Sequence, residues 1–122
     1  MKITILETSD MHGFVLPTNF TERNMNLPFS MAKARSKMDE RTLLAQSKGN
    51  IILKIENGDL LQGSALAYYL AKKSQSGVHD LVEVTNASGY QVGLLGNHEF
   101  NYGLNYLQSY VDQAAYPILA AN

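Results

Sequence analysis

The chain contains no cysteine, and this absence excludes several kinds of chemistry at once. Without thiols there can be no disulfide, no thiolate-bound metal and no cysteine nucleophile. Metal ligands would have to be oxygen atoms or imidazole nitrogens. Histidine is scarce too, with three among 122 residues, so imidazole ligands can come from three positions only.

Long hydrophobic runs are also missing. The longest, such as "IIL" and "GLLG", are far too short to cross a bilayer, and no hydrophobic leader precedes the first apolar segment, "KITILET". We therefore expect a cytoplasmic protein with no membrane partner. The alternative is a secreted or cell-surface protein whose signal has been removed.

An excess of one charge sign is absent as well. The formal net charge is -1 and the pI is near 6.3, which gives no electrostatic case for binding nucleic acid or an anionic membrane. Lys33, Arg35, Lys37 and Arg41 lie in one predicted helix, but their spacing spreads them around it, as on a solvated face. Any anionic substrate must therefore be held by local groups.

What is present is an alternation of strand and helix patterns in a chain long enough for one domain or part of one, with 45% hydrophobic residues. Apolar, β-branched segments predict strands, and longer mixed segments predict helices. The predicted strands are 2–8, 50–56, 90–96 and 116–122; the predicted helices are 29–47, 64–74, 78–88 and 103–114. This order predicts an α/β fold with mostly parallel strands and helices on the faces of the sheet.

One further segment bears on function. Residues 13–28 contain two of the three prolines and read as a long loop, and loops of that length are often functional. His79 falls in the predicted helix 78–88, away from the strand ends, and is expected to be a solvated residue.

Polar side chains follow three of the predicted strands. Asp10 and His12 come after the first, Asp59 after the second, and Asn97 and His98 after the third. Because ligands bind at the carboxyl ends of parallel strands, these side chains should meet at one edge. Carboxylate, imidazole and amide ligands without sulfur suit manganese, zinc, iron or a similar ion. Two such ions could activate a water and hold the oxygens of a phosphoester.

The blocks that carry these residues are "TSDMHG", "NGDLLQG" and "GNHEFNYG", in that order. They resemble the first three signature blocks of the calcineurin-like metallophosphoesterases, whose domain is a β-sandwich flanked by helices. Within them the chain is most similar to the 5'-nucleotidase and 2',3'-cyclic-nucleotide 2'-phosphodiesterase/3'-nucleotidase family. The strings "NGDLLQGSALAYYLAKK" and "LGNHEFNYGLNYL" look most like the cyclic-phosphodiesterase branch.

The resemblance implies a role for each matching residue. Asp10 and His12 would bind the first of two divalent ions, Asp59 would bridge both, and Asn97 would bind the second. His98 would be the catalytic histidine, oriented by Asn101, which stands where the 5'-nucleotidases usually have Asp. Asn101 can accept a hydrogen bond but supplies no negative charge to the imidazole. Glu99 is expected to support the loop by hydrogen bonding, outside the metal ligands.

The same resemblance implies that part of the family's structure is missing from residues 1–122. The family completes its metal centre with histidines further along the chain and carries a second domain that binds the nucleoside. Residues 1–122 therefore look like the N-terminal part of a metallophosphoesterase catalytic domain, inactive alone and able to self-associate through an exposed sheet edge. The expected substrate is a nucleotide. Alternatives are a 5'-nucleotidase, a nucleotide-sugar hydrolase, or a non-catalytic metal- or ligand-binding module.

Overall fold

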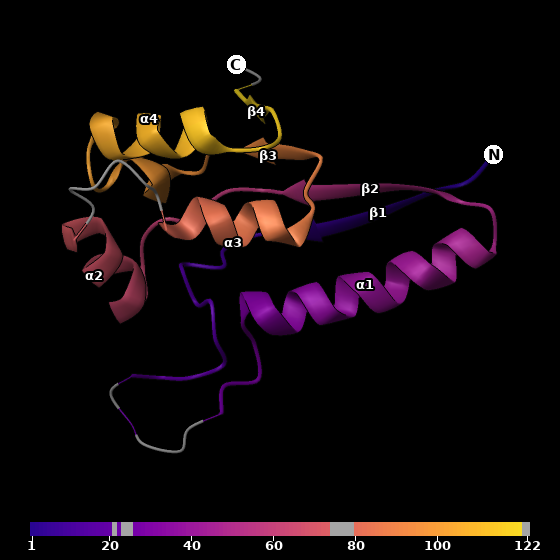
Figure 1. Ribbon diagram of the computed structural model, residues 1–122, viewed down its shortest axis with the longest axis horizontal. Coiled ribbons are helices and arrows are strands. Elements are labelled where there is room, and N and C mark those ends of the chain that lie inside the picture. Colours follow the sequence, from indigo (N-terminus) through magenta and orange to yellow (C-terminus); the bar gives the residue numbers. More distant parts are fainter. Residues whose placement is uncertain (21, 23–25, 74–79, 121–122) are drawn as a thin grey trace.

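The computed structural model describes residues 1–20, 22, 26–73 and 80–120. In these residues, strands β1 (Ile3–Thr8), β2 (Ile51–Glu56), β3 (Val92–Leu94) and β4 (Ile118–Leu119) form one parallel sheet in the order β1-β2-β3-β4 (Figure 1). β1 and β2 pair over their full lengths. The predicted α/β fold with parallel strands is confirmed, and β3 and β4 are shorter than expected.

Helices connect the strands where the sequence predicted them. They are α1 (Met31–Ser47), α2 (Ala65–Lys73), α3 (Asp80–Ser88) and α4 (Leu104–Gln113), with an unpredicted 3-10 turn, η1 (Asn97–Phe100), after β3. The predictions for residues 74, 78, 79, 121 and 122 lie outside the described residues, and with them the expectation for His79. Among the helices of the described part, none is long and apolar enough to cross a membrane.

Local hydrogen bonds define the limits of α1, the longest helix. Ser30 is its N-cap, and the Ser30 hydroxyl accepts the Lys33 backbone N–H at 3.1 Å. At the other end the Gly49 N–H reaches the Gln46 carbonyl at 2.9 Å, with Gly49 at φ 70°. A residue with positive φ stops a helix cheaply when it is glycine, so the chain turns here into β2.

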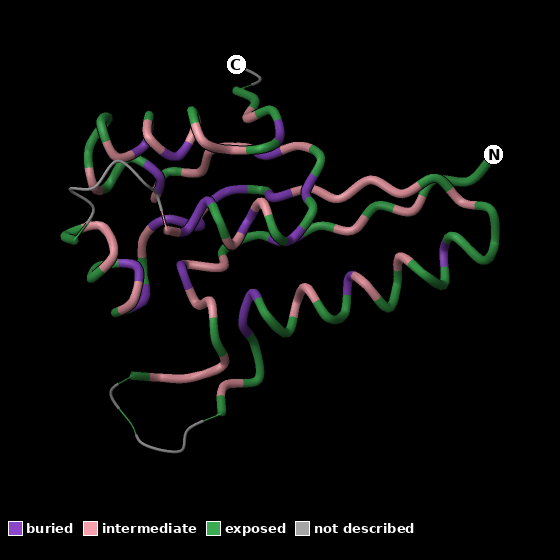
Figure 2. The backbone as a smooth tube through the Cα atoms, in the orientation of Figure 1, coloured by how far each residue is buried: buried purple, intermediate pink, exposed green. Residues whose placement is uncertain are grey.

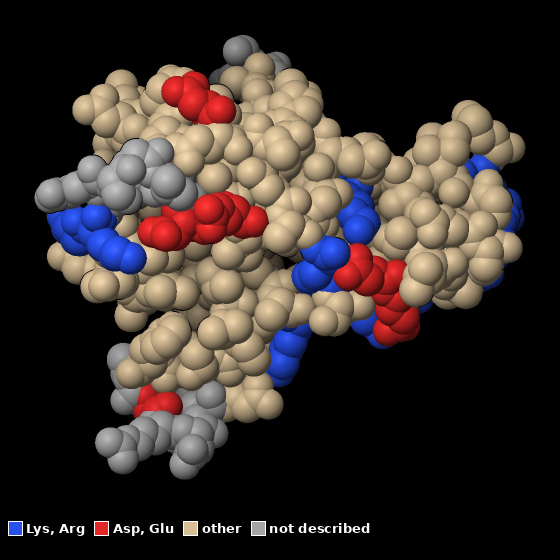
Figure 3. Space-filling model, in the orientation of Figure 1, with Lys and Arg blue, Asp and Glu red and all other residues tan. Residues whose placement is uncertain are grey.

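Two pairs of oppositely charged side chains lie along α1. Arg35 Nε lies 2.6 Å from Asp39 Oδ2, and Lys37 Nζ lies 2.7 Å from Glu40 Oε2. Figure 3 shows blue and red side chains next to one another in this region rather than one broad basic area on the visible face. These contacts agree with a solvated helix face.

The helices cover one face of the sheet. Connections between parallel strands are right-handed, so a sheet whose strands follow in sequence order receives every crossover on the same face. On that face Leu6 and Ile118 pack against Met38, Tyr90 and Tyr116. Figure 2 shows no buried backbone along the first residues of β1 and β2.

The main core lies near the carboxyl ends of the strands. Leu60, Leu61 and Leu81 are almost fully buried there, together with Ala67 and Tyr110. Leu60 and Leu61 immediately follow Asp59, so the loop after β2 is anchored by two side chains that are at most 1% exposed. The candidate site residues therefore stand on the best-packed part of the fold.

Candidate metal centre

Three of the predicted metal ligands converge beyond the carboxyl ends of β1 and β2. Asp10, His12 and Asp59 each offer one ligand atom, and these three atoms lie within 4.8 Å of one another. His12 Nε2 is 4.0 Å from Asp10 Oδ1. Two carboxylates and one imidazole form a donor set that suits manganese, zinc or iron, so the residues present fit a divalent ion.

All three residues have left-handed backbone conformations. Their φ angles are 55° for Asp10, 48° for His12 and 56° for Asp59. Such angles are uncommon outside glycine, and they persist where surrounding structure holds them. Here the two loops hold each other, since the Asp10 N–H donates to the Gly58 carbonyl at 3.1 Å and the His12 N–H to the Asp59 carbonyl at 2.9 Å. The ligand positions are therefore fixed by backbone hydrogen bonds.

A backbone carbonyl fixes the orientation of the His12 ring. Nδ1 of His12 lies 2.6 Å from the Gln62 carbonyl oxygen, which can only accept a hydrogen bond. Nδ1 therefore carries the proton, and Nε2 is left unprotonated and able to bind a metal ion. Gly63 lies against this ring: a Cβ there would be 2.9 Å from His12 Nδ1.

The Asp59 carboxylate sits between the loops that follow β2 and β3. Its Oδ1 accepts the His98 backbone N–H at 2.9 Å. On the other side it touches Gly96, where a Cβ would lie 2.2 Å from the same oxygen. Only glycine leaves room for the carboxylate in this position.

The predicted catalytic residues stand beside these ligands. The His98 ring centroid is 5.1 Å from that of His12, and the two rings meet edge to face. His98 Nδ1 lies 2.8 Å from Asn101 Oδ1. Since the amide oxygen only accepts, Nδ1 carries the proton and Nε2 is left unprotonated.

Asn97 follows β3, at the carboxyl end of the sheet. It is an exposed residue at the start of η1 and lines a hollow of about 330 Å³ with Leu94, Phe100 and Leu119. The role of Asn97 as a ligand stays a prediction.

The buried side chain of Glu99 supports the two loops that carry the site. This side chain is 1% exposed, and its carboxylate accepts four backbone N–H groups. They belong to Asp59 at 2.8 Å, Leu60 at 2.6 Å, Leu61 at 3.1 Å and Gly96 at 2.7 Å. The expected supporting role agrees with these contacts, but sequence reasoning did not find that one carboxylate joins the loops after β2 and β3.

The sequence did not predict a second buried carboxyl group, that of Glu56. Glu56 ends β2, is 1% exposed, and accepts the Gly58 N–H at 3.1 Å. Burial, followed by the neighbouring Glu99, raises its pKa to about 8. The available signal was the position of Glu56 in its strand. Glu56 lies two residues after Lys54, so the two side chains share a face of the sheet, and Glu56 pairs with Gly93 of β3. On that face Lys54 Nζ is 3.4 Å from Asp39 on α1.

We expect Glu56 to make the free energy of unfolding depend on pH. A carboxyl group with a raised pKa binds its proton more tightly in the folded state, so the free energy of unfolding should fall as pH rises from about 4.5 to about 8. In metal-free protein, Glu56→Gln should flatten this decline and stabilise the fold at pH 8 by roughly 2 kcal/mol. Urea unfolding between pH 5 and 9 measures it. The exposed Glu83→Gln is the control, and an unchanged pH slope in Glu56→Gln would contradict the assignment.

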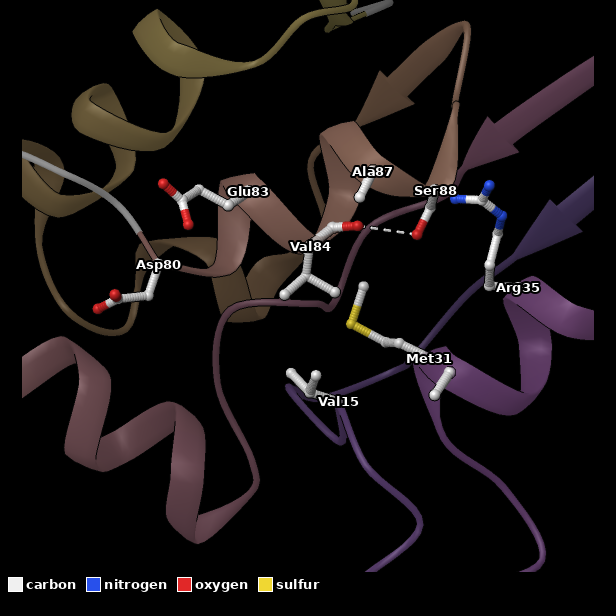
Figure 4. Close-up of a pocket in the computed structure, with 9 residues that line it drawn as sticks. Val15, Met31, Arg35, Asp80, Glu83, Val84, Ala87 and Ser88 are labelled. Carbon is white, nitrogen blue, oxygen red and sulfur yellow. Dashed lines mark hydrogen bonds between the residues drawn. The ribbon is translucent and has the colours of Figure 1, made fainter.

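The groove between α1 and α3 lies away from the candidate site. It has a volume of about 360 Å³ and an apolar lining that includes Val15, Met31 and Val84. Figure 4 shows Arg35 on one side of it and Asp80 and Glu83 on the other. None of the predicted site residues lines this groove.

Comparisons with known proteins place this chain among phosphoesterases. A 2',3'-cyclic-nucleotide 2'-phosphodiesterase/3'-nucleotidase from Haemophilus influenzae is 35% identical over 122 residues, covering 98% of this chain and 18% of that protein. A 5'-nucleotidase from Vibrio vulnificus is 27% identical, covering 99% and 20%. The crystal structure of the calcineurin-like phosphoesterase YfkN from Bacillus subtilis superposes with a TM-score of 0.85 at 34% identity, covering 97% of this chain and 36% of that one.

The match covers a small part of each relative. This chain spans about a fifth of the length of the two curated relatives named above. A comparison with models of protein families finds no match.

Proposed function

This chain belongs to the calcineurin-like phosphoesterases, and we propose that it supplies the N-terminal part of a catalytic domain that hydrolyses nucleotide phosphoesters with two divalent ions. The favoured reaction is that of a 2',3'-cyclic-nucleotide 2'-phosphodiesterase/3'-nucleotidase. Further metal ligands and the domain that binds the nucleoside would come from sequence outside residues 1–122. By itself, the chain is expected to be inactive.

The observation that carries this proposal is the convergence of three ligand side chains beside a histidine. Asp10, His12 and Asp59 lie close enough to share an ion, and the His98 ring lies against the ring of His12. A structural turn does not require this combination of residues, whereas hydrolysis of a phosphoester with two metal ions makes use of it.

Each residue would have a distinct task. Asp10, His12 and Asp59 would hold the ions, with Asp59 shared between them and Asn97 completing the second position. Bound divalent ions would supply positive charge to the phosphoryl oxygens and lower the pKa of a water molecule. His98, held through Nδ1 by Asn101, would direct Nε2 at the phosphate and stabilise its negative charge or assist the leaving group.

The choice of branch has support from the comparisons and from Asn101. The cyclic-phosphodiesterase relative is 35% identical to this chain and the 5'-nucleotidase 27%. Asn101 orients His98 without adding a negative charge, in keeping with the difference between the branches noted above. The alternatives for the same site are hydrolysis of 5'-nucleotides and of nucleotide sugars.

A chimera tests the function directly. Residues 1–122 would replace the matching part of the Haemophilus influenzae relative, and the purified chimera would be assayed with manganese on 2',3'-cyclic AMP, 3'-AMP, 5'-AMP and a nucleotide sugar. We expect turnover of the cyclic and 3' substrates. In the chimera, His98→Ala should lower kcat at least 100-fold with little change in manganese affinity, because His98 acts on the substrate.

The controls separate folding from chemistry. Gln108→Ala, an exposed change on α4, should leave turnover unchanged. Preferential hydrolysis of 5'-AMP would move the assignment to the 5'-nucleotidases. A chimera that binds manganese but turns over none of the four substrates would contradict the proposal and favour a binding module.

A further inference from the structure

The groove between α1 and α3 has walls that the surrounding structure holds in place. On one wall, the Met31 N–H donates to the Phe14 carbonyl at 2.8 Å and the Ala32 N–H to the Val15 carbonyl at 3.1 Å. These bonds fix the segment after β1 against the start of α1. On the other wall, α3 is anchored by the fully buried side chain of Leu81. The groove is therefore preformed, as ligand-binding grooves usually are.

The lining changes character along the groove. Its centre is apolar and consists of Val15, Met31, Ala32, Val84 and Ala87. Figure 4 shows the carboxylates of Asp80 and Glu83 on the side of the first turn of α3, and Arg35 toward the Ser88 end. Because α3 runs from Asp80 to Ser88, the two ends of the groove are about 12 Å apart.

The charged groups at both ends can bind a further partner. Among the residues that the structure describes, no ion pair involves Asp80 or Glu83. Arg35 Nε already lies 2.6 Å from Asp39, but a guanidinium carries five N–H donors and can bind a second carboxylate. A complementary ligand is thus apolar in the middle, basic at one end and acidic at the other.

A helix fits this groove better than an extended peptide. An extended chain needs partners for its own N–H and C=O groups, such as a sheet edge supplies, whereas this groove is lined by α1, α3 and Val15. A helix pairs those groups internally and presents side chains at i, i+3 or i+4, and i+7 on one face, over about 10 Å. Two turns of helix therefore match the length of the groove.

We propose that the groove between α1 and α3 binds an amphipathic helix of a partner protein. Apolar side chains of that helix occupy the centre, a basic side chain in its last turn faces Asp80 and Glu83, and an acidic side chain in its first turn faces Arg35. This order of charges also suits the helix dipole, so the bound helix runs antiparallel to α3. The inference does not depend on the proposed catalytic function.

Binding of a synthetic peptide tests the proposal. The probe is a helical peptide of about 15 residues with two glutamates in its first turn, leucines at i, i+3 or i+4, and i+7, and two lysines in its last turn. Labelled with fluorescein and titrated with the 122-residue chain, it should bind with a Kd of roughly 100 μM or tighter, as expected of a small interface. The Met31 methyl signal should shift in NMR spectra, because Met31 lines the groove.

A substitution that fills the groove should prevent binding. Ala87 is an exposed residue that lines the groove on α3, so Ala87→Arg should weaken binding of the probe at least tenfold by occupying the space of a leucine. Gln46→Arg is the matched control. It places the same side chain at the exposed far end of α1 and should leave the affinity unchanged.

A charge reversal guards against a variant that simply misfolds. Glu83→Lys should weaken binding of the probe about fivefold, because attraction at that end becomes repulsion. A second peptide, in which the two lysines of the probe are replaced by glutamates, should bind Glu83→Lys more tightly than it binds the wild-type chain. Such a gain is not expected of a misfolded protein.

Three outcomes would overturn the proposal. The first is no binding of the probe at about 1 mM protein. The second is equal weakening by Gln46→Arg and Ala87→Arg. The third is a Glu83→Lys variant that binds both peptides with wild-type affinity.

Discussion

Glu99→Ala is expected to unfold or severely destabilise the chain and to weaken metal binding. Removing the carboxylate leaves the N–H groups of Asp59, Leu60, Leu61 and Gly96 without their acceptor in a buried site. An unsatisfied buried donor costs about 1–3 kcal/mol, so the loss in the free energy of unfolding should be at least about 3 kcal/mol. Urea unfolding measures this part of the prediction.

Measuring metal affinity shows whether Glu99 positions Asp59 or only stabilises the fold. Manganese titrations by calorimetry should show affinity reduced about 10- to 100-fold in any Glu99 variant that still folds, as for other residues that orient metal ligands. Glu99→Gln keeps one acceptor oxygen and should lie between wild type and Glu99→Ala. Glu83→Ala, an exposed change on α3, should alter neither property. Wild-type affinity in folded Glu99→Gln and Glu99→Ala would mean that Glu99 does not position Asp59.

Gly96→Ala should impair metal binding without first disturbing the backbone. Gly96 has a φ of -92°, which any residue can adopt, so the effect comes from the added methyl group. That methyl would lie 2.2 Å from Asp59 Oδ1, and the carboxylate must move to avoid it. We expect manganese affinity to fall about 10-fold or more, because a ligand displaced by an ångström no longer matches the site.

Gly89→Ala should have the opposite pattern of effects, on stability and not on metal affinity. Gly89 has a φ of 71° with open space around it, so a methyl group there meets no atom but strains the backbone. We expect Gly89→Ala to cost about 1 kcal/mol of stability and to leave manganese affinity unchanged. If calorimetry showed the same loss of affinity for both variants, the steric explanation for Gly96 would be wrong.

The sequence predicted the elements well because their signals are local. The apolar, β-branched segments around Ile3 and Ile51 and the polar residues that follow them are adjacent along the chain. Parallel pairing then brings Asp10 and Asp59 to one edge of the sheet without further information. This is why the convergence of three ligands could be expected before the structure was known.

The supporting structure could not be predicted because its contacts are distant in sequence. Glu99 reaches Asp59 across 40 positions, and no periodic pattern indicates which backbone groups a buried carboxylate will find. The left-handed backbone of His12 is similar, because its sequence neighbours allow several turn types. The shortening of β3 and β4 to three and two residues also depends on packing.

The backbone bonds between the loops after β1 and β2 have a mechanical consequence. The Ser64 N–H donates to the His12 carbonyl at 2.8 Å, adding to the bonds that tie Asp10 to Gly58 and His12 to Asp59. Because of these bonds we expect the two loops to move together. Bending of the less buried amino-terminal halves of β1 and β2 would displace both loops without changing the spacing of the ligand atoms that they carry.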